Sequence, residues 1–354
     1  MQHDGAKRVV VVGAGPVGIA AALGARERGH QVTVLEAGEI GASLRKWGAT
    51  RFFTPLHMNF PGATGDDLLT GMEFVERVLV PAAAPLKVRT NTRVVSISRR
   101  GMTRTDYANH PLRAERPFRI LTDGDELFEA DVVLDATGNT ALPLPYAARG
   151  HVEAIRTLGE LHARVDELRG KRVLVIGHGH SAANALGVLR DAGAEITWAV
   201  RTANARPCEE IANDPLPERR RVVAEANELA KQLRVERRAG VESVARDNGH
   251  IEVALTGGRW AEVDAVVALT GYRPASDYAS ELALDISPVS EGGARLYRAI
   301  SKITDCLCAP KVGKDDLTTG EPNYFFVGAR AYGRSRTFLL QTGYQQLQAI
   351  LDSL

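Results

Sequence analysis

The chain has 354 residues, 44% of them hydrophobic and 25% charged, which is enough for about two domains that each bury a core. Its 44 lysines and arginines nearly cancel its 43 aspartates and glutamates. We therefore expect no nucleic acid and no anionic membrane as a partner.

The beginning of the chain shows no export or membrane signal. Residues 1–10, MQHDGAKRVV, lack the charged, apolar and small-residue regions of a secretion signal. Gly13, Gly15 and Pro16 divide the uncharged run 9–25 into a strand and a helix that are too short to span a bilayer. Three cysteines are too few for a disulfide framework and fit a reducing compartment. These features predict a cytoplasmic protein.

The stretch KRVVVVGAGPVG, residues 7–18, predicts a dinucleotide site. An apolar strand runs into G-x-G-x-x-G and then into an alanine-rich helix that ends at Gly29, a residue suited to a left-handed C-cap. The glycines allow a tight turn, approach of a pyrophosphate and close packing of helix on strand, and the helix N-terminus offers free N–H groups to the phosphates. Glu36 ends the next strand, where a carboxylate binds the hydroxyls of an unmodified ribose. The predicted contacts are Gly13, Gly15, Pro16, Gly18 and Glu36.

The same pattern returns later in the chain as KRVLVIGHGHSA, residues 171–182, in unbroken register with the first copy. Val200 stands in the place of Glu36 and is followed by Arg201, whose guanidinium can pair with a 2′-phosphate. This copy therefore predicts an NADPH site; a solvated strand-end charge is the alternative for Arg201. For His178 and His180 we keep two alternatives, contact or acid–base work at the nucleotide and mere solvation. The predicted contacts are Gly177, Gly179, His180, Ser181, Ala182, Arg201 and Gly271.

Two such sites in one chain resemble the flavoproteins with two dinucleotide-binding domains, a group that contains thioredoxin reductases and flavin-containing monooxygenases. The stretch DVVLDATGN, residues 131–139, resembles the strand and Ala-Thr-Gly turn (Ala136, Thr137 and Gly138) at which the chain of that family leaves the FAD domain. AVVALTGYRP, residues 265–274, resembles the point of return, and the proline-rich stretch 141–145 suits a linker. The resemblance implies an α/β fold of two Rossmann-like domains, with the NADPH domain inserted into a discontinuous FAD domain. The implied bounds are 1–145 and 278–354 for FAD and 150–275 for NADPH.

The C-terminal part departs from this family at one point. The strand YFFVG ends in Gly328, but Ala-Arg follows where the family has an aspartate for the ribityl chain, so we expect a backbone group to replace that contact. An amphipathic helix follows, with Thr337 as its predicted N-cap. In the family the start of this helix points at the flavin pyrimidine, and its dipole would stabilise an anion there. The apolar positions of the helix are Leu340, Tyr344, Leu347 and Leu351.

The two copies differ in length between the glycine turn and the turn that follows the last strand of the copy. This stretch covers 13–136 in the first copy and only 177–269 in the second. We assign much of this excess to residues 43–71. This aromatic segment resembles the part of FAD monooxygenases that passes beside the flavin ring, and an ordinary core cluster is the alternative. The stretches 179–186 and 329–344 also resemble a bacterial branch of short monooxygenase-like proteins. The candidates for ring contacts are Trp47, Arg51, Phe52 and Phe53.

The cysteines do not form a recognisable electron relay. Thioredoxin-type reductases use a Cys-x-x-Cys in the NADPH domain, where this chain has only Cys208, and the glutathione-type pair after the first glycine motif is absent. Cys306 and Cys308 enclose one residue, which suits a disulfide poorly, and no histidine accompanies them, so we predict no metal site. We expect incidental thiols; Cys306 beside the flavin is the alternative. The basic segment 217–238 predicts a solvated helix.

Without a thiol relay, the resemblance implies that reduced flavin passes its electrons to an acceptor that diffuses to it. Our first hypothesis is an NADPH-dependent FAD monooxygenase that oxygenates nitrogen or sulfur of a small molecule with dioxygen through a flavin C4a-hydroperoxide. The second is a reductase of a diffusible acceptor such as a low-molecular-weight disulfide, and the third is a non-catalytic redox-sensing scaffold. The sequence leaves open whether the chain forms a homodimer. The catalytic candidates are Trp47, Arg51 and Cys306.

Overall fold

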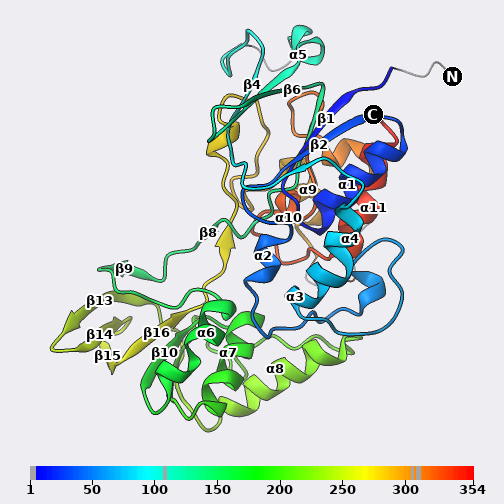
Figure 1. Cartoon of the computed structure of the whole chain (residues 1–354). Coiled ribbons are helices and arrows are strands. Elements are labelled where there is room, and N and C mark those ends of the chain that lie inside the picture. The colour runs from blue at the N-terminus through cyan, green and yellow to red at the C-terminus, as the bar shows by residue number, and fades with distance from the viewer. Residues whose placement is uncertain (1–4, 107–109, 304–306, 308–311) are drawn as a thin grey trace.

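The computed structural model describes residues 5–106, 110–303, 307 and 312–354, and it contains two parallel sheets with helices packed on them (Figure 1). The first sheet has the strand order β18-β7-β1-β2-β3, so that a strand from the C-terminal part lies beside strands from the N-terminal part. The second has the order β12-β11-β10-β16 and comes wholly from the middle of the chain. We call the parts built on these sheets the first unit and the second unit. This arrangement confirms the α/β fold of two Rossmann-like domains, one inserted into the other.

The bounds of the strands follow. In the first sheet they are β1 (Arg8–Val12), β2 (Gln31–Leu35), β3 (Val88–Arg89), β7 (Val132–Asp135) and β18 (Tyr324–Phe326). In the second they are β10 (Arg172–Ile176), β11 (Glu195–Ala199), β12 (Arg234–Glu236) and β16 (Ala265–Ala268). Antiparallel sheets comprise β4 (Val94–Arg99), β5 (Phe118–Thr122) and β6 (Leu127–Ala130) in the first unit, and β13 (Val241–Asp247), β14 (His250–Leu255) and β15 (Arg259–Val263) in the second, where β9 (Ala147–Arg149) joins β13 in parallel.

The helices are mostly short. The α-helices are α1 (Pro16–Glu27), α2 (Ala42–Arg45), α3 (Gly71–Phe74), α4 (Val80–Ala83), α5 (Leu112–Glu115), α6 (Leu158–Arg164), α7 (His180–Asp191), α8 (Pro217–Leu229), α9 (Ala294–Ile300), α10 (Ala329–Tyr332) and α11 (Leu340–Leu351). The 3₁₀-helices are η1 (Leu56–Met58), η3 (Val165–Leu168), η4 (Asp277–Ala279) and η6 (Lys314–Leu317), and η2 (Val75–Leu79) is a π-helical turn. Among the described residues, no helix has the length and apolar character that a membrane crossing requires.

The internal repeat extends through the first strand, helix and second strand of each unit. The bounds of β1, α1 and β2 become those of β10, α7 and β11 when 164 is added to every residue number. An ion pair at the start of the repeat recurs as well. Arg8 bonds Asp131 through its backbone N–H at 2.9 Å and through its guanidinium, and Arg172 bonds Asp264 in the same way, with the backbone bond at 2.8 Å. Each pair ties the start of the central strand to the residue before the next parallel strand.

The extra length of the first unit lies in two places. The connection from β2 to β3 covers 36–87, whereas the corresponding connection from β11 to β12 covers only 200–233. The other place is the connection from β4 to β5, where the stretch 100–117, including α5, replaces the tight turn 248–249 between β13 and β14. The assignment of much of the excess to 43–71 therefore holds only in part, because the connection from β4 to β5 adds an excess of similar size.

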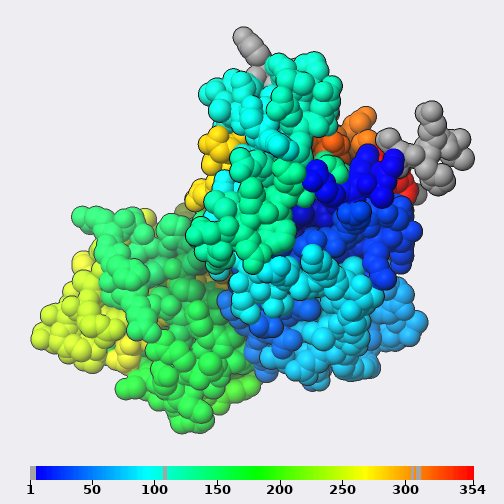
Figure 2. All heavy atoms as spheres, turned by 45° about the horizontal axis from the view of Figure 1, so that its top comes forward, coloured from blue at the N-terminus to red at the C-terminus, as the bar shows by residue number. Residues whose placement is uncertain are grey.

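The two connections between the units run side by side. β8 (Leu142–Pro143) pairs antiparallel with β17 (Tyr272–Arg273), and Leu144 donates its backbone N–H to the carbonyl oxygen of Gly271 at 2.9 Å. The space-filling view shows the middle of the chain, green to yellow, as one lobe, with the blue N-terminal residues in the other (Figure 2). The paired connections therefore link two lobes.

Two local predictions are wrong. The helix predicted for 217–238 ends at Leu229 and is followed by β12, and it is not merely solvated, because it buries Val222, Val223 and Ala226. Thr337 is not the N-cap of α11, which begins at Leu340 after an extended Leu339 without a side-chain cap. The Thr337 hydroxyl lies 3.0 Å from that of Ser335 instead.

A buried carboxylate joins the N-terminal and C-terminal parts of the first unit. Asp135, at the end of β7, accepts hydrogen bonds from the hydroxyls of Tyr278 at 2.6 Å and Tyr324 at 2.8 Å. Burial, and then the charge of Asp135, raise the pKa of both tyrosines, so their hydroxyls stay protonated and donate. Arg330, also fully buried, lies 3.4 Å from the carboxylate and balances its charge.

We expect Asp135→Asn to lower the free energy of unfolding by about 3–5 kcal/mol, because it leaves the Arg330 guanidinium buried without its countercharge. Asp131→Asn is the control, since its side chain is 39% exposed and its pair with Arg8 should contribute no more than about 1 kcal/mol. Urea denaturation of both variants measures the difference. Equal losses in the two variants would contradict this role of Asp135.

Candidate dinucleotide sites

The first glycine turn packs against the end of β7. Gly13 has a φ of +103°, and a Cβ on it would lie 2.6 Å from the carbonyl oxygen of Ala136. A Cβ on Gly18 would lie 2.0 Å from the carbonyl oxygen of Gly13, so the helix needs a residue without a side chain there. A Cβ on Gly15 would meet no atom within 4 Å. Gly15 therefore leaves open space at the N-terminus of α1, beside Pro16 at the first helical position, where a phosphate can approach the backbone.

Glu36 lies beside this turn. Its carboxylate accepts the backbone N–H of Ala14 at 2.7 Å and that of Gly38 at 2.9 Å, one on each oxygen. These bonds orient the carboxylate at the end of β2, and each oxygen keeps a further lone pair. The arrangement fits the ribose of the adenosine in FAD, whose hydroxyls can donate to both oxygens.

The second turn repeats the geometry. Gly177 has a φ of +121°, a Cβ on it would lie 2.4 Å from the carbonyl oxygen of Leu269, and a Cβ on Gly179 would meet nothing within 4 Å. Ala182 is buried in the place of Gly18, and Ser181 is exposed at the start of α7. Gly271, with a φ of +92°, follows the end of β16.

The end of β11 differs from that of β2 as the sequence predicts. Val200 is buried and Arg201 is exposed. Within the described part of the chain, the Arg201 side chain has no hydrogen bond or ion pair, so its guanidinium is free to pair with a phosphate.

The aromatic segment that follows α2 divides between the core and the boundary of the units. Trp47 and Phe52 have ring centroids 4.8 Å apart, and Phe52 packs in turn against Phe74 at 5.1 Å, inside the first unit. Phe53 faces the other way and contacts the edge of His180 in the second turn at 5.3 Å. Arg51 is exposed and bonds the carbonyl oxygen of Leu68 at 2.6 Å. Phe53 is thus the predicted ring that reaches the second unit.

β7 and β18 lie on the side of β1 opposite β2, so the turn after β7 and the end of β18 flank the first glycine turn on that side. Thr137 donates its hydroxyl to Asp135 at 2.7 Å, and Gly138 has a φ of +77°. A Cβ on Gly328 would lie 2.9 Å from Val17 of α1, so this glycine allows a close approach of β18 to the phosphate turn. Arg330 points inward to Asp135 and offers nothing to a ribityl chain. Thr337 is buried beside Ser335.

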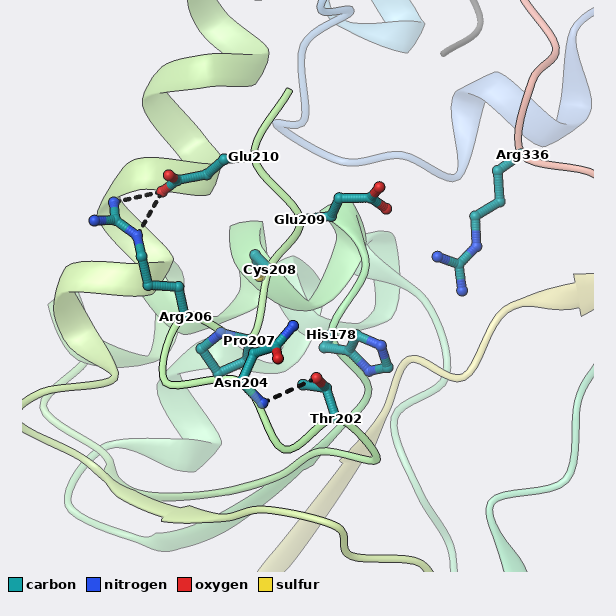
Figure 3. Close-up of a pocket in the computed structure, with 9 residues that line it drawn as sticks. All are labelled: His178, Thr202, Asn204, Arg206, Pro207, Cys208, Glu209, Glu210 and Arg336. Carbon is teal, nitrogen blue, oxygen red and sulfur yellow. Dashed lines mark hydrogen bonds and ion pairs between the residues drawn. The ribbon is translucent and has the colours of Figure 1, made fainter. Parts of the chain in front are cut away.

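A cavity of about 370 Å³ lies where the second turn faces the first unit (Figure 3). Desolvation, and then the charges of Arg336 and Arg201, lower the pKa of His178, whereas Glu209 raises it less. His180 also has a lowered pKa, by desolvation first and then by Arg219. Both imidazoles are therefore neutral at pH 7. The cavity is lined by His178, Thr202, Asn204, Arg206, Pro207, Cys208, Glu209, Glu210 and Arg336.

Cys208 is the one cysteine in the described part of the chain, and its side chain is buried. Burial raises the pKa of its thiol to about 12. Cys306 and Cys308 lie outside the described residues. Among the residues that the structure does describe, no group of three or more histidine, cysteine, aspartate or glutamate side chains could hold a metal ion.

Two features of this site had no signal in the sequence. Arg336 lines the cavity from the first unit, although it lies far along the chain from His178. Asp135 accepts a hydrogen bond from Thr137 and so stabilises the Ala-Thr-Gly turn. Asp135 lies in the stretch DVVLDATGN, but only its partners Tyr278 and Arg330, both distant in sequence, reveal its role.

The geometry of two phosphate turns on two parallel sheets agrees with a family comparison. Residues 10–291 match the family described as pyridine nucleotide-disulphide oxidoreductase. The chain belongs to this family. As a pyridine nucleotide-disulphide oxidoreductase it is an FAD-dependent oxidoreductase with FAD and NADPH as cofactors, and the residues at both turns fit these groups.

Solved structures share the fold of this pyridine nucleotide-disulphide oxidoreductase over its length. A flavin-containing monooxygenase from Stenotrophomonas maltophilia has a TM-score of 0.69 at 20% identity, and 98% of each chain is covered. The bacillithiol disulfide reductase Bdr from Staphylococcus aureus has a TM-score of 0.68 at 18% identity, covering 98% of this chain and 97% of that one. Thioredoxin reductase from T. acidophilum has 0.63 at 19% identity, with 98% of each covered. No curated protein matches the sequence.

We expect Gly15→Ala and Gly179→Ala to separate the two sites. Each alanine fits its own backbone but places a methyl group where a pyrophosphate would approach, so Gly15→Ala should lower FAD affinity at least about tenfold, and Gly179→Ala should lower NADP⁺ affinity similarly while FAD stays bound. Calorimetry with each nucleotide measures both effects, and the melting temperature of the apoprotein is the control. Loss of FAD in Gly179→Ala with the fold intact would contradict the assignment.

Proposed function

We propose that this chain is an NADPH-dependent monooxygenase that oxygenates nitrogen or sulfur of a small molecule, with FAD on the first turn and NADPH on the second. The observation that carries the proposal is the state of Cys208. A thiol with a pKa of about 12 stays protonated at pH 7, and the thiolate is the form that attacks a disulfide. Cys208 is therefore unsuited to relay electrons.

The surroundings of Cys208 also hold it in place. Its backbone N–H and carbonyl both bond the side-chain amide of Asn227, each at 3.0 Å, from the buried face of α8. A disulfide relay needs a thiol that can reach both the flavin and an acceptor. Two backbone bonds and burial oppose that movement, so Cys208 does not serve as such a relay, and the proposal has the electrons pass to an acceptor that diffuses in.

Bound FAD, once reduced by NADPH, supplies the capacity to activate dioxygen and to transfer one of its atoms to a nucleophilic nitrogen or sulfur, while the other atom leaves as water. The chain has to hold both nucleotides and exclude bulk water. Three contacts join the two units, one at the second turn and two at α6. Phe53 packs on His180, Thr50 lies 3.4 Å from His162, and Gly159 packs so closely on Lys46 that a Cβ there would lie 1.8 Å from the Lys46 carbonyl oxygen.

A reductase of a diffusible low-molecular-weight disulfide is the second candidate. The cavity beside the second turn presents the guanidinium of Arg336, which suits an anionic acceptor. A disulfide reductase shares the fold with a TM-score of 0.68, close to the 0.69 of the flavin-containing monooxygenase. Such likeness supports both activities equally, so the choice needs a test of chemistry.

Labelled dioxygen provides that test. FAD-loaded protein with NADPH, ¹⁸O₂ and a panel of amines and thioethers should give a product that carries one ¹⁸O atom, read by mass spectrometry. Cys208→Ser should keep this activity, and so should Cys306→Ser with Cys308→Ser. NADPH oxidation by a low-molecular-weight disulfide under nitrogen, kept in these cysteine variants and with no ¹⁸O in any product under ¹⁸O₂, would overturn the monooxygenase proposal in favour of the reductase.

We further propose that Arg201 selects NADPH over NADH. Arg201→Ala should lower the ratio of NADPH to NADH efficiency about 10- to 100-fold, because a charged contact to the 2′-phosphate is worth about 1.5–3 kcal/mol. Arg190→Ala on α7 is the control, since that guanidinium is already paired with Asp191 and Glu225. Flavin reduction rates with both nucleotides measure the ratio. An unchanged ratio in Arg201→Ala would make the assignment wrong.

A further inference from the structure

We propose that Arg336 of the first unit binds the pyrophosphate of the nicotinamide nucleotide held by the second unit, so that both units contact the bound nucleotide. This inference rests on the proposed placement of NADPH on the turn at Gly177–Gly179.

The position of Arg336 suggests the contact. It lies in the connection between α10 and α11, yet it lines the same cavity of about 370 Å³ as His178 of the second turn and Thr202 beyond β11. Figure 3 shows its side chain extending from the first unit towards His178 across the open space, opposite the loop that carries Cys208. A molecule on the turn would therefore meet residues of the second unit on one side and Arg336 on the other.

The charge of Arg336 is not neutralised by a close partner. The other arginine that lines the cavity, Arg206, is bound to Glu210. Arg336 is exposed, and its guanidinium has no hydrogen bond or ion pair within the residues that the structure describes. Glu209 is the carboxylate that shares the cavity with it without pairing. An exposed guanidinium without such a partner is available to bind an anion.

Two arginines can then divide the phosphates of the nucleotide between them. The charge of Arg336 acts on both histidines of the turn, and on His178 it outweighs the charge of Arg201, which acts on His178 alone. Arg336 lines the cavity together with His178 of the turn, where a pyrophosphate would meet the N-terminus of α7, and Arg201 follows the end of β11, where a 2′-phosphate would lie. Guanidinium groups bind phosphate oxygens through two parallel N–H bonds.

The test uses FAD-loaded Arg336→Ala and three probes that separate the phosphates. NADP⁺ has the pyrophosphate and the 2′-phosphate, NAD⁺ has only the pyrophosphate, and adenosine 2′-monophosphate has only the 2′-phosphate. We expect Arg336→Ala to weaken NADP⁺ and NAD⁺ by the same factor, about tenfold, and to leave adenosine 2′-monophosphate unchanged. Arg201→Ala should give the reverse pattern, with NAD⁺ unchanged and the two probes that carry a 2′-phosphate weakened.

Arg334→Ala is the matched control, because Arg334 lies two residues away and faces Glu291 at 3.5 Å. It should leave all three affinities unchanged. Unchanged NAD⁺ affinity in Arg336→Ala, with FAD content and melting temperature intact, would overturn the proposal, and so would a loss confined to NADP⁺. Failure of the underlying placement has a different pattern, in which neither Gly179→Ala nor Arg201→Ala affects any probe.

Discussion

The structure depends on one close approach that is made twice. In each unit the first glycine of the phosphate turn lies against a carbonyl oxygen at the end of the neighbouring parallel strand, Gly13 against Ala136 and Gly177 against Leu269, at distances that no side chain would allow. This approach directs each helix N-terminus to the carboxyl edge of its sheet, where free N–H groups bind phosphates. The geometry of both turns therefore requires glycine at positions 13 and 177.

The two copies differ at the end of their second strand, and the proposed placement of FAD and NADPH rests on this difference. A carboxylate held by two backbone N–H groups stands at the end of β2, and an exposed guanidinium follows the end of β11. The boundary between the units then brings side chains of the first unit, Phe53 and Arg336, to the second turn. With the proposed placement of NADPH, the first unit would therefore complete the nucleotide site of the second.

The sequence predicts the repeat well because strand, glycine turn and helix are local patterns, and the constant offset between the copies carries over to the bounds of the elements. It predicts less well where distant residues decide. Thr337 looks like a cap, but Leu339 is extended and the helix begins only at Leu340. The 217–238 segment has charges at helical spacing, yet pairing with β11 makes its last part a strand. The contacts of Asp135 reach as far along the chain as Arg330, and no local pattern marks them.

The central claim is that hydride passes from a nicotinamide nucleotide on the second turn to FAD on the first. Anaerobic titration of the FAD-loaded protein with NADPH, followed by the visible absorbance of the flavin, tests it most directly. The account predicts that the oxidised flavin band disappears as one equivalent of NADPH is added. Protein that binds both nucleotides but keeps its flavin oxidised would contradict it.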